Sequence, residues 1–249
     1  MGENKIDIPR LIAQLDALNA SGQERAAELF LEDKLEKSRR TDDWSGELTV
    51  LSELLGQYRR SGSREKGLAA ADSAVSMVRA HHLEKTVSGA TVLLNAATTL
   101  KCFGQAERSI ELFEEVNAVY SAKLDPFDYR MAGLYNNMAL SYGDMGMADE
   151  AERFFRQALE VLARCPQGEN DAAVTYCNLA ELYDKHDPED AGIESCMEKA
   201  WECLNAPSLP RDGYYAFTAS KCAPCFDYFG FFMYAGELRK RAGEIYGTA

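Results

Sequence analysis

A repeat with a period of about 42 residues constrains the fold of this sequence more than any other feature. The clearest copy, residues 134–162, reads LYNNMALSYGDMGMADEAERFFRQALEVL. Its apolar and small residues recur at helical spacing on both sides of Gly146, which predicts two amphipathic helices joined by a tight glycine turn. The pattern recurs 42 and 84 residues earlier, around Gly104 and Gly62. Because each hairpin has two apolar faces that it cannot bury alone, neighbouring hairpins are expected to stack.

The same register extends toward both ends of the chain. In the following copy Asp187-Pro188 replaces the glycine, and we expect Pro188 in the first turn of the next helix, where its missing N–H costs nothing. The last copy turns at Gly230, and a weaker N-terminal hairpin turns at Gly22. We therefore expect an all-α solenoid of about six helix hairpins, or about 12 helices. We also expect one domain over residues 1–249, made of an N-terminal capping hairpin (1–43), four repeats (44–212) and a C-terminal capping hairpin (213–249).

The hairpin pattern resembles the tetratricopeptide repeat family. The period and the segments LYNNMALSYGDMG and EAERFFRQALEVL are similar to the longer-helix variety found in kinesin light chains. The resemblance implies a right-handed α-α superhelical solenoid whose first helices line a concave groove. It also implies, in a general way, that the chain binds proteins or peptides.

Composition narrows the functional class. The chain carries 27 basic and 40 acidic residues, a net charge of −13, which disfavours binding to a phosphate backbone. It has no run of about 18 apolar residues and no apolar core of a signal peptide at its start. Seven cysteines without such a signal suggest free thiols in a reducing compartment. We therefore expect a soluble cytoplasmic protein that binds no nucleic acid, no membrane and no cofactor.

Two cysteines lie in the segment Cys222-Ala-Pro-Cys225, which has the spacing of a redox dithiol or of half a zinc site. The repeat register places Cys222 at a core position, two to three turns into a helix that starts near Gly213, and Pro224 should bend or split that helix. Redox dithiols usually lie at a helix N-terminus, and zinc needs two further ligands. We interpret the pair as core residues, with no catalytic and no metal-binding residue. Thiol oxidoreductase activity through Cys222 and Cys225 is the remote alternative.

Three asparagines occupy one register position. Asn95, Asn137 and Asn178 follow one another at spacings of 42 and 41 residues, just before the small and large core residues of each first helix. Asparagine offers a donor and an acceptor together, so each side chain could bond both backbone groups of an extended peptide. The alternative is that the asparagines bond one another or helix backbones across the stack. The remaining candidate groove residues are Asn136, Arg59, Lys101, Asp144, Lys185 and Lys221.

The function that the sequence favours is a non-catalytic interaction scaffold that holds an extended peptide or partner segment in this groove. A regulatory sensor of a small signal peptide is the alternative. Enzyme activity is disfavoured because the phosphate-binding, nucleophile-elbow and metalloprotease motifs are missing. The aromatic residues between Phe226 and Tyr234 are expected to form core, with a homodimer face or partner patch as the alternative.

Overall fold

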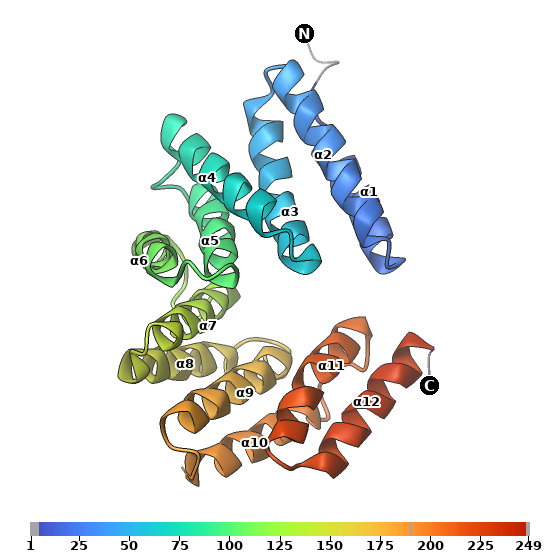
Figure 1. Ribbon diagram of the computed structural model, residues 1–249, viewed down its shortest axis with the longest axis vertical. Helices are drawn as coiled ribbons and strands as arrows, with labels where there is room; N and C mark the ends of the chain where they lie inside the picture. Colours follow the sequence, from blue (N-terminus) through green and yellow to red (C-terminus); the bar gives the residue numbers. More distant parts are fainter. Residues whose placement is uncertain (1–4, 190, 248–249) are drawn as a thin grey trace. The chain divides into compact units, whose positions relative to one another are not determined.

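The structure, a computed structural model, describes residues 5–189 and 191–247, and within these ranges the chain forms twelve α-helices and no strand (Figure 1). The first six are α1 (Ile8–Ala20), α2 (Glu24–Arg40), α3 (Trp44–Ser61), α4 (Arg64–Ala80), α5 (Val87–Cys102) and α6 (Ala106–Lys123). The other six are α7 (Tyr129–Asp144), α8 (Ala148–Leu162), α9 (Glu169–His186), α10 (Ala191–Leu204), α11 (Gly213–Tyr228) and α12 (Phe232–Tyr246). The predicted all-α class and the number of hairpins are confirmed.

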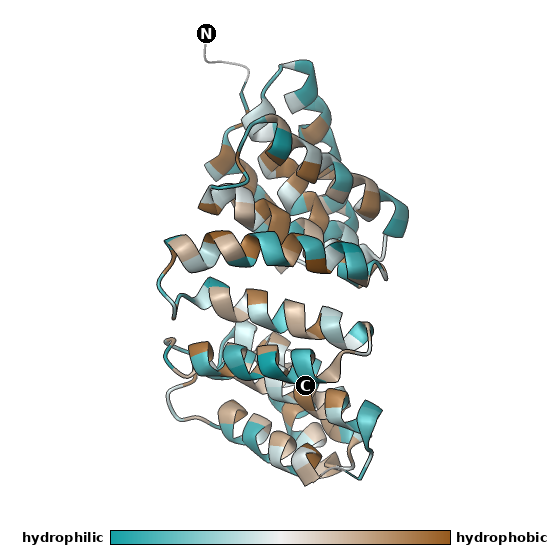
Figure 2. Cartoon of the chain, turned by 90° about the vertical axis from the view of Figure 1, so that its left-hand side faces the viewer, coloured by the Kyte–Doolittle hydropathy of each residue, from teal (hydrophilic) through white to brown (hydrophobic). Residues whose placement is uncertain are grey.

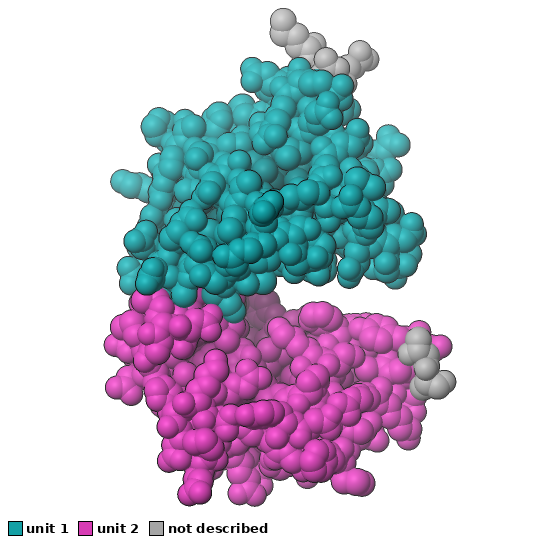
Figure 3. Space-filling view, viewed as in Figure 1, with its two compact units in different colours: residues 1–123 teal, residues 124–249 magenta. Residues whose placement is uncertain are grey.

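Contacts divide the chain into two compact units, Met1–Lys123 and Leu124–Ala249, called unit 1 and unit 2 below (Figure 3). In unit 1, α3 packs on α2, α4 and α5, and α5 packs on α6. In unit 2, each odd-numbered helix packs on the helix that follows it, and α9 also contacts α7, α8 and α11. The assignment of the whole chain to one domain stays a prediction.

Glycine turns join the helices of most hairpins, as the repeat predicts. Gly62 and Gly146 have φ of +67° and +75°, a left-handed conformation that a residue without a Cβ adopts at little cost. A backbone hydrogen bond between residues five apart then closes each of these two helices. The Met147 N–H, for example, donates to the Tyr142 carbonyl at 2.9 Å. The predicted turns at Gly22, Gly104 and Gly230 also have positive φ.

The expectation for Pro188 is wrong. Helix α9 ends at His186 and α10 begins at Ala191, so Pro188 lies in the connecting turn and not in the first turn of α10. The Asp187 carboxylate accepts the Glu189 backbone N–H at 3.0 Å. An aspartate that bonds backbone two residues ahead supports a turn by itself, which explains why the helix does not begin at the proline.

Alanines let the two helices of a repeat approach closely. In the α7–α8 hairpin Ala139, Ala151 and Ala158 are completely buried. The Tyr142 ring stacks on Phe154, with ring centroids 5.4 Å apart, and fills the space beside these small residues. Apolar and polar residues alternate along the helices (Figure 2), as expected of amphipathic helices that each bury one stripe.

The Cys222–Cys225 segment is part of the core of unit 2. Both cysteines are buried, and the Cys225 sulfur lies 3.9 Å from the Met197 sulfur on α10. Helix α11 continues through Pro224 to Tyr228, so the proline does not split it. Asp212 caps the N-terminus of α11, since its carboxylate accepts the backbone N–H of Tyr214. The core interpretation of Cys222 is therefore confirmed.

Aromatic packing closes the C-terminal hairpin. The Trp201 ring stacks on Tyr234 at 4.0 Å and meets Phe226 edge-on at 6.2 Å. Phe226 is fully buried, so the core interpretation holds for the centre of this cluster. Phe232 and Met233 at the start of α12 are exposed, at 68% and 84% of their surface.

Candidate functional site

The first helices of the three hairpins in unit 2, α7, α9 and α11, carry a pocket on one side. The pocket has a volume of about 240 Å³. It is lined by Tyr129, Ala132, Gly133, Asn136, Asn137, Leu162, Asp171, Val174, Thr175, Tyr214, Phe217, Thr218 and Lys221. Three residues of the predicted groove, Asn136, Asn137 and Lys221, are therefore brought together.

Hydrogen bonds link the asparagines of this face to neighbouring residues. The Asn178 amide donates to the Asn136 carbonyl oxygen at 3.1 Å, and the Thr175 hydroxyl donates to the same oxygen at 3.3 Å. The Asn137 amide donates to the Gly133 backbone carbonyl of its own helix at 2.9 Å. An asparagine side chain offers two donors and an acceptor with two lone pairs, so one such bond uses only part of its capacity.

Asn95 lies in unit 1 and bonds across two repeats. Its amide donates to the Ser52 hydroxyl at 2.9 Å, a contact between α5 and α3. Arg59 of α3 donates to the Asn95 backbone carbonyl at 3.1 Å and to the Thr99 hydroxyl at 2.9 Å. Burial lowers the pKa of Arg59. These two predicted residues thus tie α3 to α5.

The other predicted residues lie outside the pocket. Asp144 and Lys185 are exposed near the C-terminal ends of α7 and α9, and Lys101 is half-buried on α5. Burial raises the pKa of Glu181, and the ammonium groups of Lys185 and Lys221 act in the opposite direction. Both lysines therefore act on the same carboxylate, and one of them, Lys221, lines the pocket.

Tyr129, Asp171 and Tyr214 form a hydrogen-bonded group that was not predicted from the sequence. The Tyr214 hydroxyl donates to Asp171 Oδ1 at 2.8 Å, and the Tyr129 hydroxyl donates to Asp171 Oδ2. Burial raises the pKa of Tyr214 to about 12, and burial and the carboxylate also raise the pKa of Tyr129. Both phenols therefore stay neutral donors at physiological pH. The sequence contained one sign of this group: the three residues follow one another at spacings of 42 and 43, close to the repeat period.

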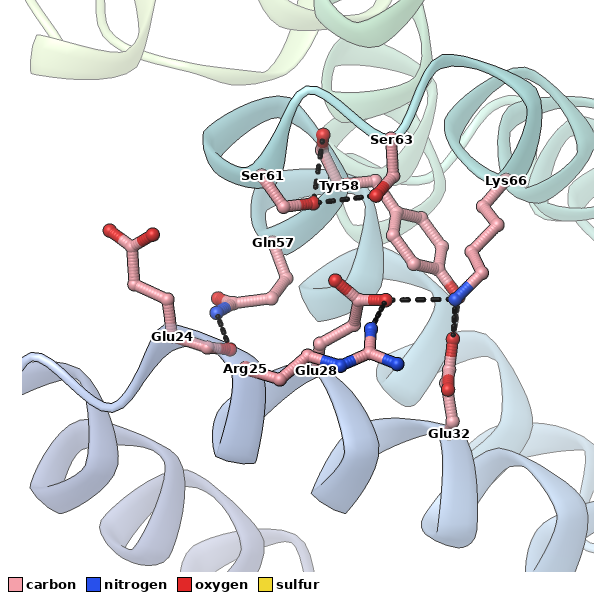
Figure 4. Close-up of polar contacts among 9 residues, drawn as sticks. All are labelled: Glu24, Arg25, Glu28, Glu32, Gln57, Tyr58, Ser61, Ser63 and Lys66. Carbon is pink, nitrogen blue, oxygen red and sulfur yellow. Dashed lines mark hydrogen bonds and ion pairs between the residues drawn. The ribbon is translucent and has the colours of Figure 1, made fainter.

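Unit 1 contains a buried carboxylate that the sequence did not reveal, because its partner Lys66 is 38 residues away along the chain. The Glu28 side chain is only 2% exposed and contacts Lys66 Nζ at 2.8 Å and Arg25 Nη1 at 2.6 Å (Figure 4). Lys66 also contacts Glu32 at 2.8 Å, and the Tyr58 hydroxyl donates to Glu32 at 3.1 Å. Burial opposes ionisation of Glu28, but the two cations outweigh it and hold the pKa of that carboxyl below its usual range. An ionised, paired carboxylate of this kind joins α2 to α4.

Cys222 and Cys225 share their core position with Cys177 of α9. The pKa of the Cys177 thiol is raised well above its usual value, first by hydrogen bonding with Cys222 and Cys225 and then by burial. Within residues 5–189 and 191–247 there is no group of three or more histidine, cysteine or acidic side chains arranged to hold a metal ion. The same ranges contain no helix with the length and apolar character needed to cross a bilayer.

Comparison with known proteins agrees with the repeat pattern. Residues 130–191 match the tetratricopeptide repeat family. Comparison with curated proteins gives no sequence match.

Solved structures with this arrangement of helices include BtubC (BKLC) from P. vanneervenii, at 17% identity over 90% of this chain and 91% of that one, with a TM-score of 0.59. A putative kinesin light chain from Podosopora anserina with nearly identical TPR-like repeats is 18% identical over 80% of this chain and 95% of that one, with a TM-score of 0.54. A MamA RS-1 double mutant is 14% identical over 82% and 96%, also with a TM-score of 0.54. At these identities the likeness is one of fold. The tetratricopeptide repeat match thus covers residues 130–191, and the helix hairpins of the other described residues resemble those of solved proteins with TPR-like repeats.

Proposed function

We propose that the chain is a non-catalytic protein-interaction scaffold that binds an extended segment of a partner protein along α7, α9 and α11. The observation that carries the proposal is the pocket of about 240 Å³, which gathers three of the predicted groove residues, Asn136, Asn137 and Lys221, with half-exposed aromatic rings. Tetratricopeptide repeats are protein-interaction modules in general, so a protein partner fits the fold. The use of this particular face is our inference.

The chemistry of the face suits an extended peptide. Asn137 and Asn178 can bond backbone amides of a ligand without regard to its sequence. One such hydrogen bond contributes about 0.5–1.5 kcal/mol net, whereas a micromolar complex needs about 8 kcal/mol. The rings of Tyr129, Tyr214 and Phe217, which are 48%, 46% and 56% exposed, offer the apolar area for the rest.

No second function is proposed. Cys222 and Cys225 are buried well inside α11, and the pKa of their neighbour Cys177 is raised, which is the opposite of what an attacking thiol needs. The cytoplasmic location and self-association through the C-terminal aromatic region stay predictions.

Replacing Asn137 and Asn178 together with alanine should weaken peptide binding about tenfold, because two hydrogen bonds to the ligand backbone are lost. Peptides would first be selected from a random heptapeptide library with the wild-type chain. Their affinities for both proteins would then be measured by calorimetry. Glu198→Ala, at an exposed position on α10, is the control and should bind like wild type.

Helicity and melting temperature of the double variant should stay close to those of wild type. Equal affinity of wild type and the double variant would overturn the assignment of this face, and so would an equal loss in Glu198→Ala.

A further inference from the structure

Three aromatic rings and one carboxylate line the pocket of unit 2. Tyr129 comes from α7, Asp171 from α9, and Tyr214 and Phe217 from α11. Each ring is about half exposed, so its face is accessible although the hydroxyls of both tyrosines are engaged. This combination differs from ordinary core packing, in which the rings would be covered.

The Asp171 carboxylate has part of its hydrogen-bond accepting capacity left. Its two hydrogen-bond donors are the neutral phenols of Tyr129 and Tyr214, one on each oxygen. An ionised carboxylate has about four acceptor positions, so each oxygen can accept a second hydrogen bond. The raised pKa of Tyr214, about 12, means that the phenols do not add a competing negative charge at neutral pH.

Lys221 is the one cationic side chain of the pocket lining, and it lies one turn beyond Phe217 on α11. Its ammonium group acts on the carboxyl of Glu181, whose pKa it lowers against the effect of burial. Lys221 is exposed to solvent, which weakens the effect of its charge on Asp171. The whole chain has a net charge of −13, which favours the approach of a cationic ligand.

We infer that this pocket binds the guanidinium group of an arginine side chain in the bound peptide. A guanidinium is planar, stacks on aromatic faces and presents parallel N–H donors that match a carboxylate. Phe217 and the two tyrosines supply the faces, and Asp171 supplies the acceptor. The inference rests on the proposed peptide-binding function and names the side chain that this part of the face recognises.

The test uses a synthetic library of capped heptapeptides whose central residue is fixed as arginine, citrulline, lysine or glutamate and whose other positions vary. Citrulline keeps the shape of arginine and removes its charge. The arginine set should bind wild type at least about tenfold more tightly than the citrulline set, because the cation–aromatic contact and the charged hydrogen bonds are both lost.

Asp171→Asn should reduce the arginine preference to about twofold or less. Asp184→Asn is the matched control, because Asp184 lies on the same helix outside the pocket and accepts the Tyr228 hydroxyl at 2.9 Å. Asp184→Asn removes the charge from the same kind of aspartate–tyrosine hydrogen bond and should keep the arginine preference.

Equal binding of the arginine and citrulline sets, or a preference for glutamate, would overturn the inference while leaving peptide binding intact. Binding of every set with the same affinity to wild type and to the Asn137→Ala/Asn178→Ala variant would instead overturn the proposed function.

Discussion

Gly168→Ala should lower the free energy of unfolding of unit 2 by about 3 kcal/mol, because a methyl group has no space where α8 passes into α9. A Cβ at this position would lie 2.2 Å from the Leu162 carbonyl oxygen and 3.2 Å from that of Cys165. Both neighbours are backbone atoms and cannot turn aside as a side chain would. The junction between hairpins would have to open.

Gly236→Ala is the matched control within the same unit. Gly236 lies inside α12, and a Cβ there would meet no atom within 4 Å. Alanine in place of glycine at an open helical position should raise the stability by about 0.5–1 kcal/mol.

Urea unfolding followed by Trp201 fluorescence measures both changes in a Trp44→Phe background, since the chain has two tryptophans and Trp44 lies in unit 1. If Gly168→Ala unfolds like the background protein, the packing described for this junction is wrong.

Glu28→Gln should destabilise unit 1 by about 2 kcal/mol at pH 7, because Arg25 and Lys66 then donate to a neutral amide oxygen in place of a carboxylate. Glu36→Gln is the control on the same helix. The Glu36 carboxylate is 72% exposed and lies 3.9 Å from Arg40, and an exposed pair of this kind should contribute less than about 0.5 kcal/mol. Amide hydrogen exchange of α2 and α4 would locate the change.

The Glu28 pair also predicts a pH dependence. Because the folded protein holds the pKa of Glu28 below its usual value, the unfolded chain takes up the proton first as the pH falls. The advantage of wild type over Glu28→Gln should be complete above about pH 4.3, the ordinary glutamate value, and should disappear as the pH falls through the lowered pKa. A difference that stayed constant from pH 7 to pH 3 would contradict the ion-pair explanation.

The hairpins could be predicted from the sequence because their turns need a particular residue. A left-handed turn favours glycine strongly, so Gly62, Gly104, Gly146 and Gly230 marked the helix ends. In the connection between α9 and α10 a hydrogen bond to the Asp187 side chain takes the place of the glycine turn, and there the start of the next helix was predicted at the wrong residue. Pro224 was expected to bend or split α11; it does not split the helix, because a helix packed on two neighbours tolerates one missing bond.

The candidate site could be predicted only where one residue type recurs. The asparagines stood out because the same side chain returns at the same register. Tyr129, Asp171 and Tyr214 occupy another register position, but their types differ, so only the folded chain shows that they bond. Glu28 was missed for a related reason, since its partner Lys66 is 38 residues away.

Photo-crosslinking of a library-selected peptide tests most directly whether the partner lies along α7, α9 and α11. A benzophenone side chain would be placed at position 217, in the pocket, or at position 198, on the exposed side of α10. We predict efficient crosslinking from position 217 and background levels from position 198. Equal or stronger crosslinking from position 198 would contradict the account.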